Sequence, residues 1–213
     1  GGSLSGLVPL DGIPIADQPF RVAGQLSFAD EDTLAVNDLE ASYGPASARG
    51  ELQLSVTDPT AAGEIRIEAE GASLTSIVPA AAEYVGTDTG FRIVGGGRWQ
   101  TESLWLQETS LRVGEMTLDV QGEVHAPPDI TGTALSLDAS LPSLRILEVA
   151  AGQPLPDEPL TVQAELRAED DAFQLSGFDL KFGRSDVSGS AAFQPAGETR
   201  EVPTINAQLI GEV

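Results

Sequence analysis

Residues 160–193, LTVQAELRAEDDAFQLSGFDLKFGRSDVSGSAAF, decide how the whole chain is interpreted. Apolar and polar side chains alternate across residues 160–166, which is the period of a half-buried β-strand. The alternation resumes after an acidic turn, changes phase at Ser176-Gly177 and continues to Phe182. One extra residue at the change of phase would form a β-bulge and keep the apolar side chains on one face. The stretch therefore predicts three antiparallel strands, the second of them bulged.

The three-stranded unit recurs with a period of about 70 residues, which is typical of a repeat architecture. An aromatic or β-branched residue followed by glycine closes the second strand of each copy, at Tyr43-Gly44, Val113-Gly114 and Phe182-Gly183. The change of phase recurs at the same step, at Asn37-Asp38, Gln107-Glu108 and Ser176-Gly177. We therefore expect one elongated domain over residues 1–213, with repeats at approximately 3–72, 73–139 and 140–213.

A fourth strand with the same alternation follows each unit, with apolar positions at residues 65–69, 133–139 and 205–209. The chain as a whole therefore predicts an all-β fold with an elongated antiparallel sheet. Four strands in each of three copies give about twelve strands, which would span roughly 55–60 Å at about 4.8 Å per strand.

Short connecting helices are expected between the copies, where they would edge the sheet rather than form a layer. We expect one helix to be capped by Ser140 and to end before Gly152. A second should run over residues 73–84 and be interrupted or restart at Pro79. The corresponding segment of the first copy, around Gly12, should form only a turn.

The charge of the chain excludes several classes of function. Its 213 residues include 11 Lys and Arg against 33 Asp and Glu, a net charge of -22, with 41% hydrophobic residues. Nucleic-acid binding needs basic patches, and docking on an anionic membrane surface needs positive charge, so we expect neither. The hydrophobic content is ample for a core, so the chain is not expected to be disordered.

Cysteine is absent, which excludes disulfides, thiolate metal sites and cysteine nucleophiles. The sequence also lacks an apolar run of the about 18 residues that a membrane-spanning helix needs. The chain begins inside a repeat, and we expect it to be a fragment of a longer protein whose anchor and targeting signals lie outside it.

The sequence offers little for catalysis or for metal binding. His125 is the single histidine, and no partner motif for a catalytic triad or a zinc site flanks it. The acidic clusters at residues 30–32 and 169–171 lack the spacing of a calcium loop and are expected to be solvated hairpin turns. Gly95-Gly96-Gly97 lies within a strand, so it indicates a bulge or a close approach rather than a phosphate loop. We expect no enzymatic activity, no cofactor and no metal.

The regular apolar face is the feature from which a function can be inferred. Trp99 and Trp105 are candidates to edge a groove on this face, although structural packing explains them equally well. The alternative for the face as a whole is the dry interior of an ordinary β-sandwich.

The repeat pattern resembles the AsmA/TamB group of bacterial envelope proteins. The resemblance is carried by the opening strand at residues 160–166, by Phe173-x-Leu-x-x-Phe-x-Leu-x-Phe-Gly and by Ser185-x-Val-x-Gly. A Ser-Leu segment between copies fits as well, at residues 3–7, 73–77 and 140–144. The resemblance covers nearly the whole chain, and the order and period of the motifs give it its specificity.

This resemblance implies a curved sheet that forms an open, β-taco-like groove in the periplasm. It further implies a bridge-like lipid transfer protein, anchored in the inner membrane by a segment outside this chain, that carries phospholipid or other acyl-chain lipid towards the outer membrane. Membrane proteins would contact the ends of the full-length chain. The candidate groove residues are Phe20, Val22, Leu26, Phe28, Leu34, Val36, Leu52, Leu54, Ile93, Leu104, Leu106, Leu118, Val120, Phe173, Leu175, Phe178, Leu180, Phe182 and Phe193.

Two further interpretations belong to other classes of protein. In the first, the chain is an envelope assembly or scaffold module whose edge strands promote assembly of outer-membrane β-barrel proteins by β-augmentation. In the second, it is a β-rich adhesin or solenoid, with outward ligand contacts and a dry core.

Overall fold

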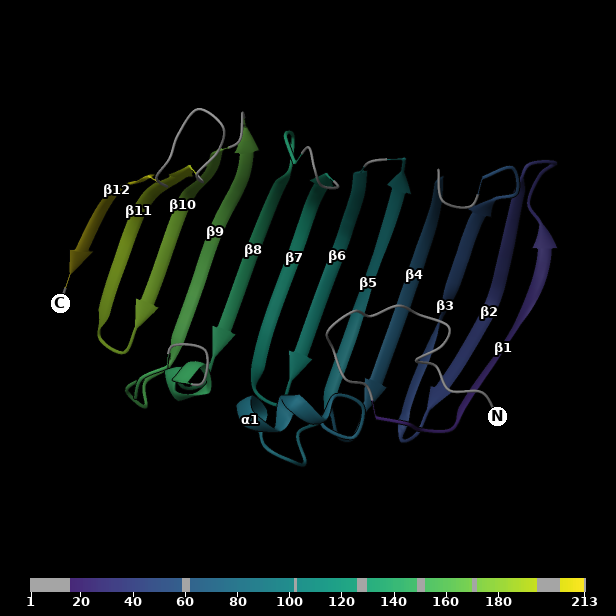
Figure 1. Cartoon of the computed structure of the whole chain (residues 1–213), viewed down its shortest axis with the longest axis horizontal. Helices are drawn as coiled ribbons and strands as arrows, with labels where there is room; N and C mark the ends of the chain where they lie inside the picture. Colours follow the sequence, from purple (N-terminus) through teal and green to yellow (C-terminus); the bar gives the residue numbers. More distant parts are fainter. Residues whose placement is uncertain are drawn as a thin grey trace.

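Twelve β-strands follow one another along the part of the chain that the structure describes (Figure 1). The structure is a computed structural model that describes residues 16–58, 62–101, 103–125, 130–148, 152–169, 172–194 and 204–212. The first copy contains β1 (Phe20–Phe28), β2 (Thr33–Tyr43), β3 (Ala46–Ser55) and β4 (Ala62–Gly71). The second contains β5 (Phe91–Gln100), β6 (Ser103–Val113), β7 (Met116–His125) and β8 (Ala134–Leu141). The third contains β9 (Leu160–Glu169), β10 (Ala172–Phe182), β11 (Ser185–Gln194) and β12 (Thr204–Glu212).

All of these strands belong to one antiparallel sheet, in the order β1 to β12. Each strand pairs with the strands before and after it in the sequence, because short connections favour pairing between sequence neighbours. The edge strands β1 and β12 do not pair with each other, so the sheet is open. The prediction of an all-β fold with one elongated antiparallel sheet is confirmed.

A β-bulge interrupts the second strand of each copy where the apolar alternation changes phase. The register with the following strand shifts between Val36 and Leu39, between Leu106 and Thr109, and between Leu175 and Phe178. Inside these steps, residues in the left-handed region have φ angles of 50°, 44° and 56°, at Asp38, Glu108 and Gly177 respectively. The predicted bulges are therefore confirmed, each with a residue in the left-handed conformation that one class of bulge uses.

The bulges keep the apolar side chains of each interrupted strand on one side of the sheet. Residues directly opposite each other in an antiparallel pair share a face. Before the bulge Val36 lies opposite Leu52, and after it Leu39 lies opposite Gly50. Without the extra residue, Leu39 would point to the other face, because side chains alternate with a period of two.

The connecting segments lie along one end of the strands, at the lower edge of Figure 1. The segment after β4 contains the 3-10 helix η2 (Pro79–Ala81) and the helix α1 (Ala82–Val85). Helical structure thus starts only at Pro79, so the helix expected over residues 73–84 is confirmed in its second half, whereas residues 73–78 form no helix. The turn expected around Gly12 lies outside the described residues.

The segment after β8 forms the 3-10 helix η3 (Leu144–Leu147), and its cap differs from the expected one. Ser143 caps this helix, because its Oγ accepts a hydrogen bond from the Arg145 backbone N–H at 3.2 Å. The predicted cap, Ser140, is still part of β8, where it lies opposite Thr161. The strand continues for longer than the local sequence suggested, because pairing with β9 extends it to Leu141.

The segment after β4 packs on the ends of the central strands. Leu74, Ile77 and Val85 contact a small cluster of buried residues formed by Ala46, Phe91 and Val113. The segment therefore covers the apolar side of the sheet at one end of the strands. It does not extend over the middle of the strands. Among the residues that the structure describes, no helix is long and apolar enough to cross a bilayer.

Candidate functional site

One side of the sheet, which we call the apolar face, is apolar from edge to edge. A single row of opposite residues crosses all twelve strands, in the order Leu26, Val36, Leu52, Ile65, Gly97, Leu106, Gly122, Leu135, Leu166, Leu175, Ala191 and Ala207. We define the apolar face as the side that carries this row. The strand positions that share this side include no Asp, Glu, Lys or Arg within the described strands.

The structure places every predicted groove residue on this face. The register puts Phe20, Val22, Leu26, Phe28, Leu34 and Val36 there from the first hairpin, and Leu52 and Leu54 from β3. From the second copy it adds Ile93, Leu104, Leu106, Leu118 and Val120. From the third copy it adds Phe173, Leu175, Phe178, Leu180, Phe182 and Phe193.

Other residues share this face although sequence reasoning did not select them as groove candidates. They include Ile65, Ile67, Leu135, Leu137, Val162, Leu166, Ile205 and Leu209, which come mostly from the fourth and first strands of the copies. The signal that finds them is the parity of the apolar alternation, which is the same signal that found the other candidates.

Among the residues that the structure describes, no second sheet covers the apolar face. A sandwich core needs two sheets packed face to face about 10 Å apart, whereas the described strands form one sheet. Few apolar side chains are buried as a result: the buried hydrophobic residues are mostly alanines, and Leu160 and Phe91 are the largest that are well covered, at 8% and 9% exposure. The dry sandwich alternative is therefore excluded for the described residues.

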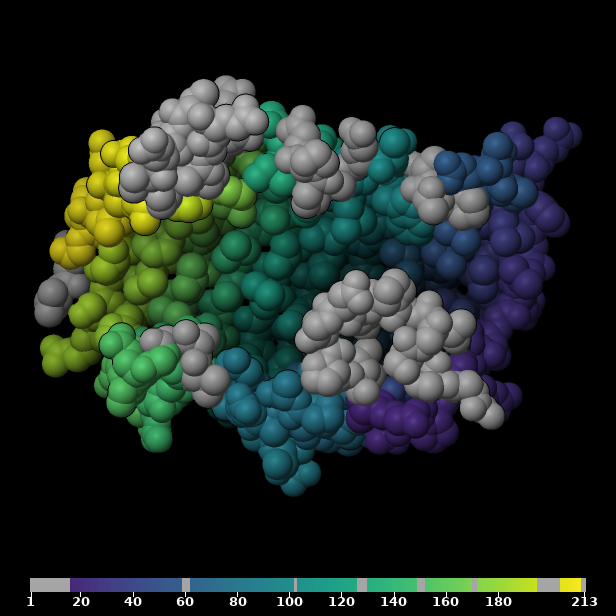
Figure 2. Space-filling model, viewed as in Figure 1, coloured from purple at the N-terminus to yellow at the C-terminus, as the bar shows by residue number. Residues whose placement is uncertain are grey.

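Figure 2 shows the apolar face, because the connecting segment that packs on it stands at the front. The middle of the sheet recedes and the ends of the strands come forward, so the face is hollowed. Apolar side chains inside the hollow are partly protected by their neighbours, as for Val162 and Leu166, which alternate with exposed polar residues in β9. At the two edges of the sheet the protection is lost, and Leu26 and Ile205 are each 71% exposed.

Aromatic side chains line parts of this face. The rings of Phe173 and Phe193 stack with their centroids 6.3 Å apart and their planes at 27°. The Trp99 ring lies over Gly63, so closely that a side chain at residue 63 would collide with it. Trp99 therefore belongs to the apolar face, where its packing on Gly63 agrees with the alternative of structural packing. Trp105 does not: it lies opposite Arg98 on the other face and is 50% exposed, which corrects the expectation that both tryptophans edge one groove.

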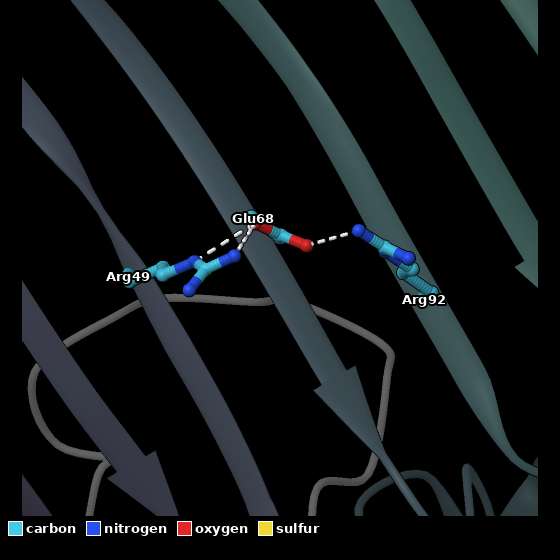
Figure 3. A network of polar contacts seen from close by, with 3 residues as sticks. All are labelled: Arg49, Glu68 and Arg92. Carbon is cyan, nitrogen blue, oxygen red and sulfur yellow. Dashed lines mark hydrogen bonds and ion pairs between the residues drawn. The ribbon is translucent and has the colours of Figure 1, made fainter.

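The other face of the sheet carries the charges. Figure 3 shows Glu68 of β4 between Arg49 of β3 and Arg92 of β5. Arg49 donates from Nη2 to Glu68 Oε2 at 2.5 Å, and Arg92 Nη2 pairs with Glu68 Oε1. This network joins the first copy to the second on the polar face. The depression there, of about 650 Å³, is lined by Arg49, Glu68 and other charged side chains and lies on the side opposite to the apolar face.

Hydrogen bonds from Arg49 and from Arg92 lower the pKa of Glu68 below its ordinary value of 4.5. The ionised carboxylate therefore stabilises the fold above that pH, and its contribution is lost as the pH falls through the lowered pKa. We expect Glu68→Gln to lower the melting temperature slightly near neutral pH, and we expect this difference to shrink as the pH falls below 4.5. Melting curves across that range measure the difference.

The control for this prediction is Glu51→Gln, which removes a carboxylate from the same face of the neighbouring strand β3. The difference between Glu68→Gln and the unmodified chain should also shrink at high salt, because the network is exposed and is screened. A Glu68→Gln effect that stays constant with pH would contradict this role of the charge.

The other residues considered for catalysis or metal binding do not form a common site. His125 lies at the end of β7, with its Nε2 3.2 Å from Glu123 Oε1. Asp30 lies in the turn between β1 and β2, where its Oδ1 accepts a hydrogen bond from the Asp32 N–H at 2.9 Å. Residues 170–171 of the second acidic cluster lie outside the described residues. Within the part of the chain that the structure describes, no group of acidic and histidine side chains is arranged to hold a metal ion.

Glycines allow neighbouring strands to approach each other closely next to the bulges. In each copy a Cβ on one glycine of the third strand would collide with a backbone carbonyl oxygen of the fourth strand: Gly50 with Arg66, Gly122 with Ala134, and Gly189 with Gln208. Gly95, from the predicted glycine run in β5, similarly lies against the second bulge, where a Cβ would be 2.8 Å from Thr109 Oγ1. The register with β6 shifts between Val94 and Gly96, as the expectation of a bulge at this run requires.

Comparison of the chain with protein-family models, with curated proteins and with solved structures finds no match.

Proposed function

We propose that this chain is a segment of a periplasmic bridge-like lipid transfer protein, in which the hollowed apolar face shields phospholipid acyl chains between the inner and outer membranes. The observation that carries the proposal is the apolar row that crosses all twelve strands, over which the described part of the chain places no second sheet. Apolar surface in water is unfavourable by roughly 25 cal/mol per Å², so a face of this extent favours an apolar occupant.

An acyl chain suits the face better than a polar ligand does. Each methylene that leaves water contributes roughly 0.8 kcal/mol, and the row offers branched aliphatic side chains such as Leu106, Leu166 and Leu175 for these contacts. Because the face has no charged residue at its strand positions, it offers no fixed partner for a head group. The head groups would stay in solvent at the open side, and discrimination between lipid classes would be weak.

The periplasmic location and the bridge between membranes rest on the resemblance of the repeats to the AsmA/TamB group. Transfer along the sheet would run across the strands, from β1 towards β12 or the reverse, because the apolar rows run in that direction.

The test is to ask whether the purified chain holds lipid and on which face. Native mass spectrometry of the chain, purified without detergent from a bacterial host, should detect co-purified phospholipid of mixed head groups. A photoreactive amino acid at Leu106, on the apolar face, should crosslink to lipid, whereas the same group at Gln107, an exposed residue next to it, should not. Absence of lipid above the level of an unrelated protein purified in parallel, or equal crosslinking from both positions, would refute the proposal.

A second candidate function is an assembly module that promotes folding of outer-membrane β-barrel proteins by β-augmentation. The observation that favours it is the pair of open sheet edges, since an unpaired edge strand is a template for another strand. Photocrosslinkers in β12, at Ile205 or Ile210, would then capture barrel proteins in cells. Capture of lipid at Leu106 without capture of barrel proteins in β12 would favour the conduit.

A further inference from the structure

The polar face has a second depression, in the middle of the sheet beside Trp105. Its volume is about 780 Å³, which lies within the roughly 300–1,000 Å³ that is typical of ligand sites. Its lining comes from β4, β6, β7, β8 and β9. We call this depression the Trp105 hollow. It lies on the side opposite to the apolar face, because Trp105 stands between Leu104 and Leu106, which point to that face.

Trp105 is the single aromatic residue at the polar-face positions of the described strands. Its neighbours across the sheet, Arg98 and Glu123, each have another partner: Arg98 Nη2 lies 3.1 Å from Glu64 Oε2, and Glu123 Oε1 lies 3.2 Å from His125 Nε2. The tryptophan remains 50% exposed. Exposed aromatic surface is unfavourable in water, so packing within the chain accounts for only part of this residue.

The Trp105 hollow carries no surplus charge, although the chain as a whole has a net charge of -22. The charged side chains of its lining are two arginines and two glutamates, Arg66, Arg167, Glu108 and Glu165. Both arginines lie next to a carboxylate: Arg66 is 3.1 Å from Glu64, and Arg167 is 3.8 Å from Glu165. Charge complementarity therefore favours a neutral ligand over either a cation or an anion.

Uncharged hydrogen-bonding groups surround the indole ring in this hollow. Gln107 of β6, Gln121 of β7 and Ser136 of β8 line it, and all three are exposed. None of these three side chains is hydrogen-bonded to another residue that the structure describes. An amide and a hydroxyl can each both donate and accept hydrogen bonds, so these groups match a ligand that is rich in hydroxyls.

The Trp105 hollow continues into the depression around Glu68, because Arg66, Gln107 and Glu108 line both. Gly96 lies between Arg66 and Gln107 in the sheet, and it places no side chain between them. A Cβ at residue 96 would lie 3.5 Å from Arg66 Cγ and 4.0 Å from Gln107 Cβ. Together the two depressions reach from β2 to β9, which is roughly 30 Å at about 4.8 Å per strand. This length suits a chain molecule better than a single small one.

We propose that the polar face binds a neutral oligosaccharide, with one sugar ring stacked on Trp105 and its hydroxyls hydrogen-bonded to Gln107 and Gln121. A pyranose with equatorial hydroxyls presents C–H groups on its faces and hydroxyls at its rim, so its face suits an aromatic ring and its rim suits polar side chains. Nucleic acid would need a surplus of basic residues, which this hollow lacks. The inference does not rest on the proposed lipid function, because the two ligands occupy opposite faces of the sheet.

Calorimetric titration with cellohexaose, a neutral linear glucose oligomer, tests this proposal. The chain should bind it saturably, whereas sorbitol, which has hydroxyls but no ring, should not bind. Trp105→Ala should weaken the binding at least about tenfold, since a tryptophan at the centre of a contact contributes most to affinity. Tyr84→Ala is the matched control, because Tyr84 is an aromatic residue of α1 that is 40% exposed and lies outside the hollow. It should leave the affinity unchanged.

Gln121→Ala provides a second variant, at an exposed position where loss of the side chain should not disturb folding. It should weaken cellohexaose binding about fivefold, the effect of one neutral hydrogen bond. Gln208→Ala, at an exposed glutamine on the same face of β12, should have no effect. Leu26→Glu, on the apolar face, should also leave this binding unchanged, so the sugar and the lipid are tested separately. Absence of cellohexaose binding, or binding that Trp105→Ala does not weaken, would overturn the proposal.

Discussion

Gly50→Ala is expected to lower the stability of this protein more than most single methyl additions do, by at least about 2 kcal/mol. A Cβ at residue 50 would collide with the backbone carbonyl oxygen of Arg66 and would lie 3.1 Å from the Ile67 Cα. Neither atom can yield as a side chain could, because both belong to β4, which is held in register by β3 and by β5. The sheet would have to unbend next to the first bulge.

Gly177→Ala is the matched comparison for this prediction. Gly177 has a φ of 56°, but a Cβ there would meet nothing within 4 Å. Alanine at residue 177 therefore carries only the cost of the left-handed conformation, about 1–2 kcal/mol. Thermal melts of the two variants should show the larger loss for Gly50→Ala, with a decrease of the melting temperature of about 4 °C or more. An effect of Gly50→Ala no greater than that of Gly177→Ala would contradict the close approach.

Leu175→Glu is expected to reduce the amount of co-purified lipid at least about tenfold. Residue 175 lies in the row that crosses the apolar face, so a carboxylate there would have to stay charged among acyl chains or take up a proton. A charged acidic side chain in a hydrocarbon environment costs about 2.5 kcal/mol, and about 1.4 kcal/mol already corresponds to a tenfold change in affinity. Lipid extraction and quantitative mass spectrometry, per mole of folded protein, measure the change.

Gln174→Glu is the matched control for the lipid prediction. It adds the same charge at the neighbouring residue of β10, which is exposed and opposite Ala192 on the other face. Since Leu175 is half-buried, Leu26→Glu provides a second variant: Leu26 belongs to the same row but is 71% exposed, so its replacement should leave the fold intact. Retention of lipid in both apolar-face variants would refute a lipid-binding role for this face.

Much of the fold could be predicted from local patterns. The bulges were found at the correct residues because an extra residue must appear as a change of phase in an alternating strand, as at Gln107-Glu108. The same parity assigned the groove candidates to one side, and it should have placed Trp105 on the other, since it stands between Leu104 and Leu106. The error came from treating both tryptophans by residue type rather than by position.

The cap of η3 is a feature that local sequence patterns do not predict. Ser140 and Ser143 both precede apolar residues, and either could cap a helix by residue type. Ser143 does so because β8 extends to Leu141, which lies opposite Leu160 of the next copy. The length of that strand depends on a partner about 20 residues away in the sequence, which no local pattern contains.

By itself, the sequence of this protein determined the strands, their bulges and the fact that one side of every strand is apolar. These features are local, because the side-chain period of a strand follows from its backbone. Only the tertiary structure decided that the strands pair in a single open order from β1 to β12 and that, within the described residues, no second sheet covers the apolar face. Alternation specifies which side chains share a face, but it does not specify what that face meets. That depends on whether the sheet folds onto itself, and hence on long-range pairing and curvature.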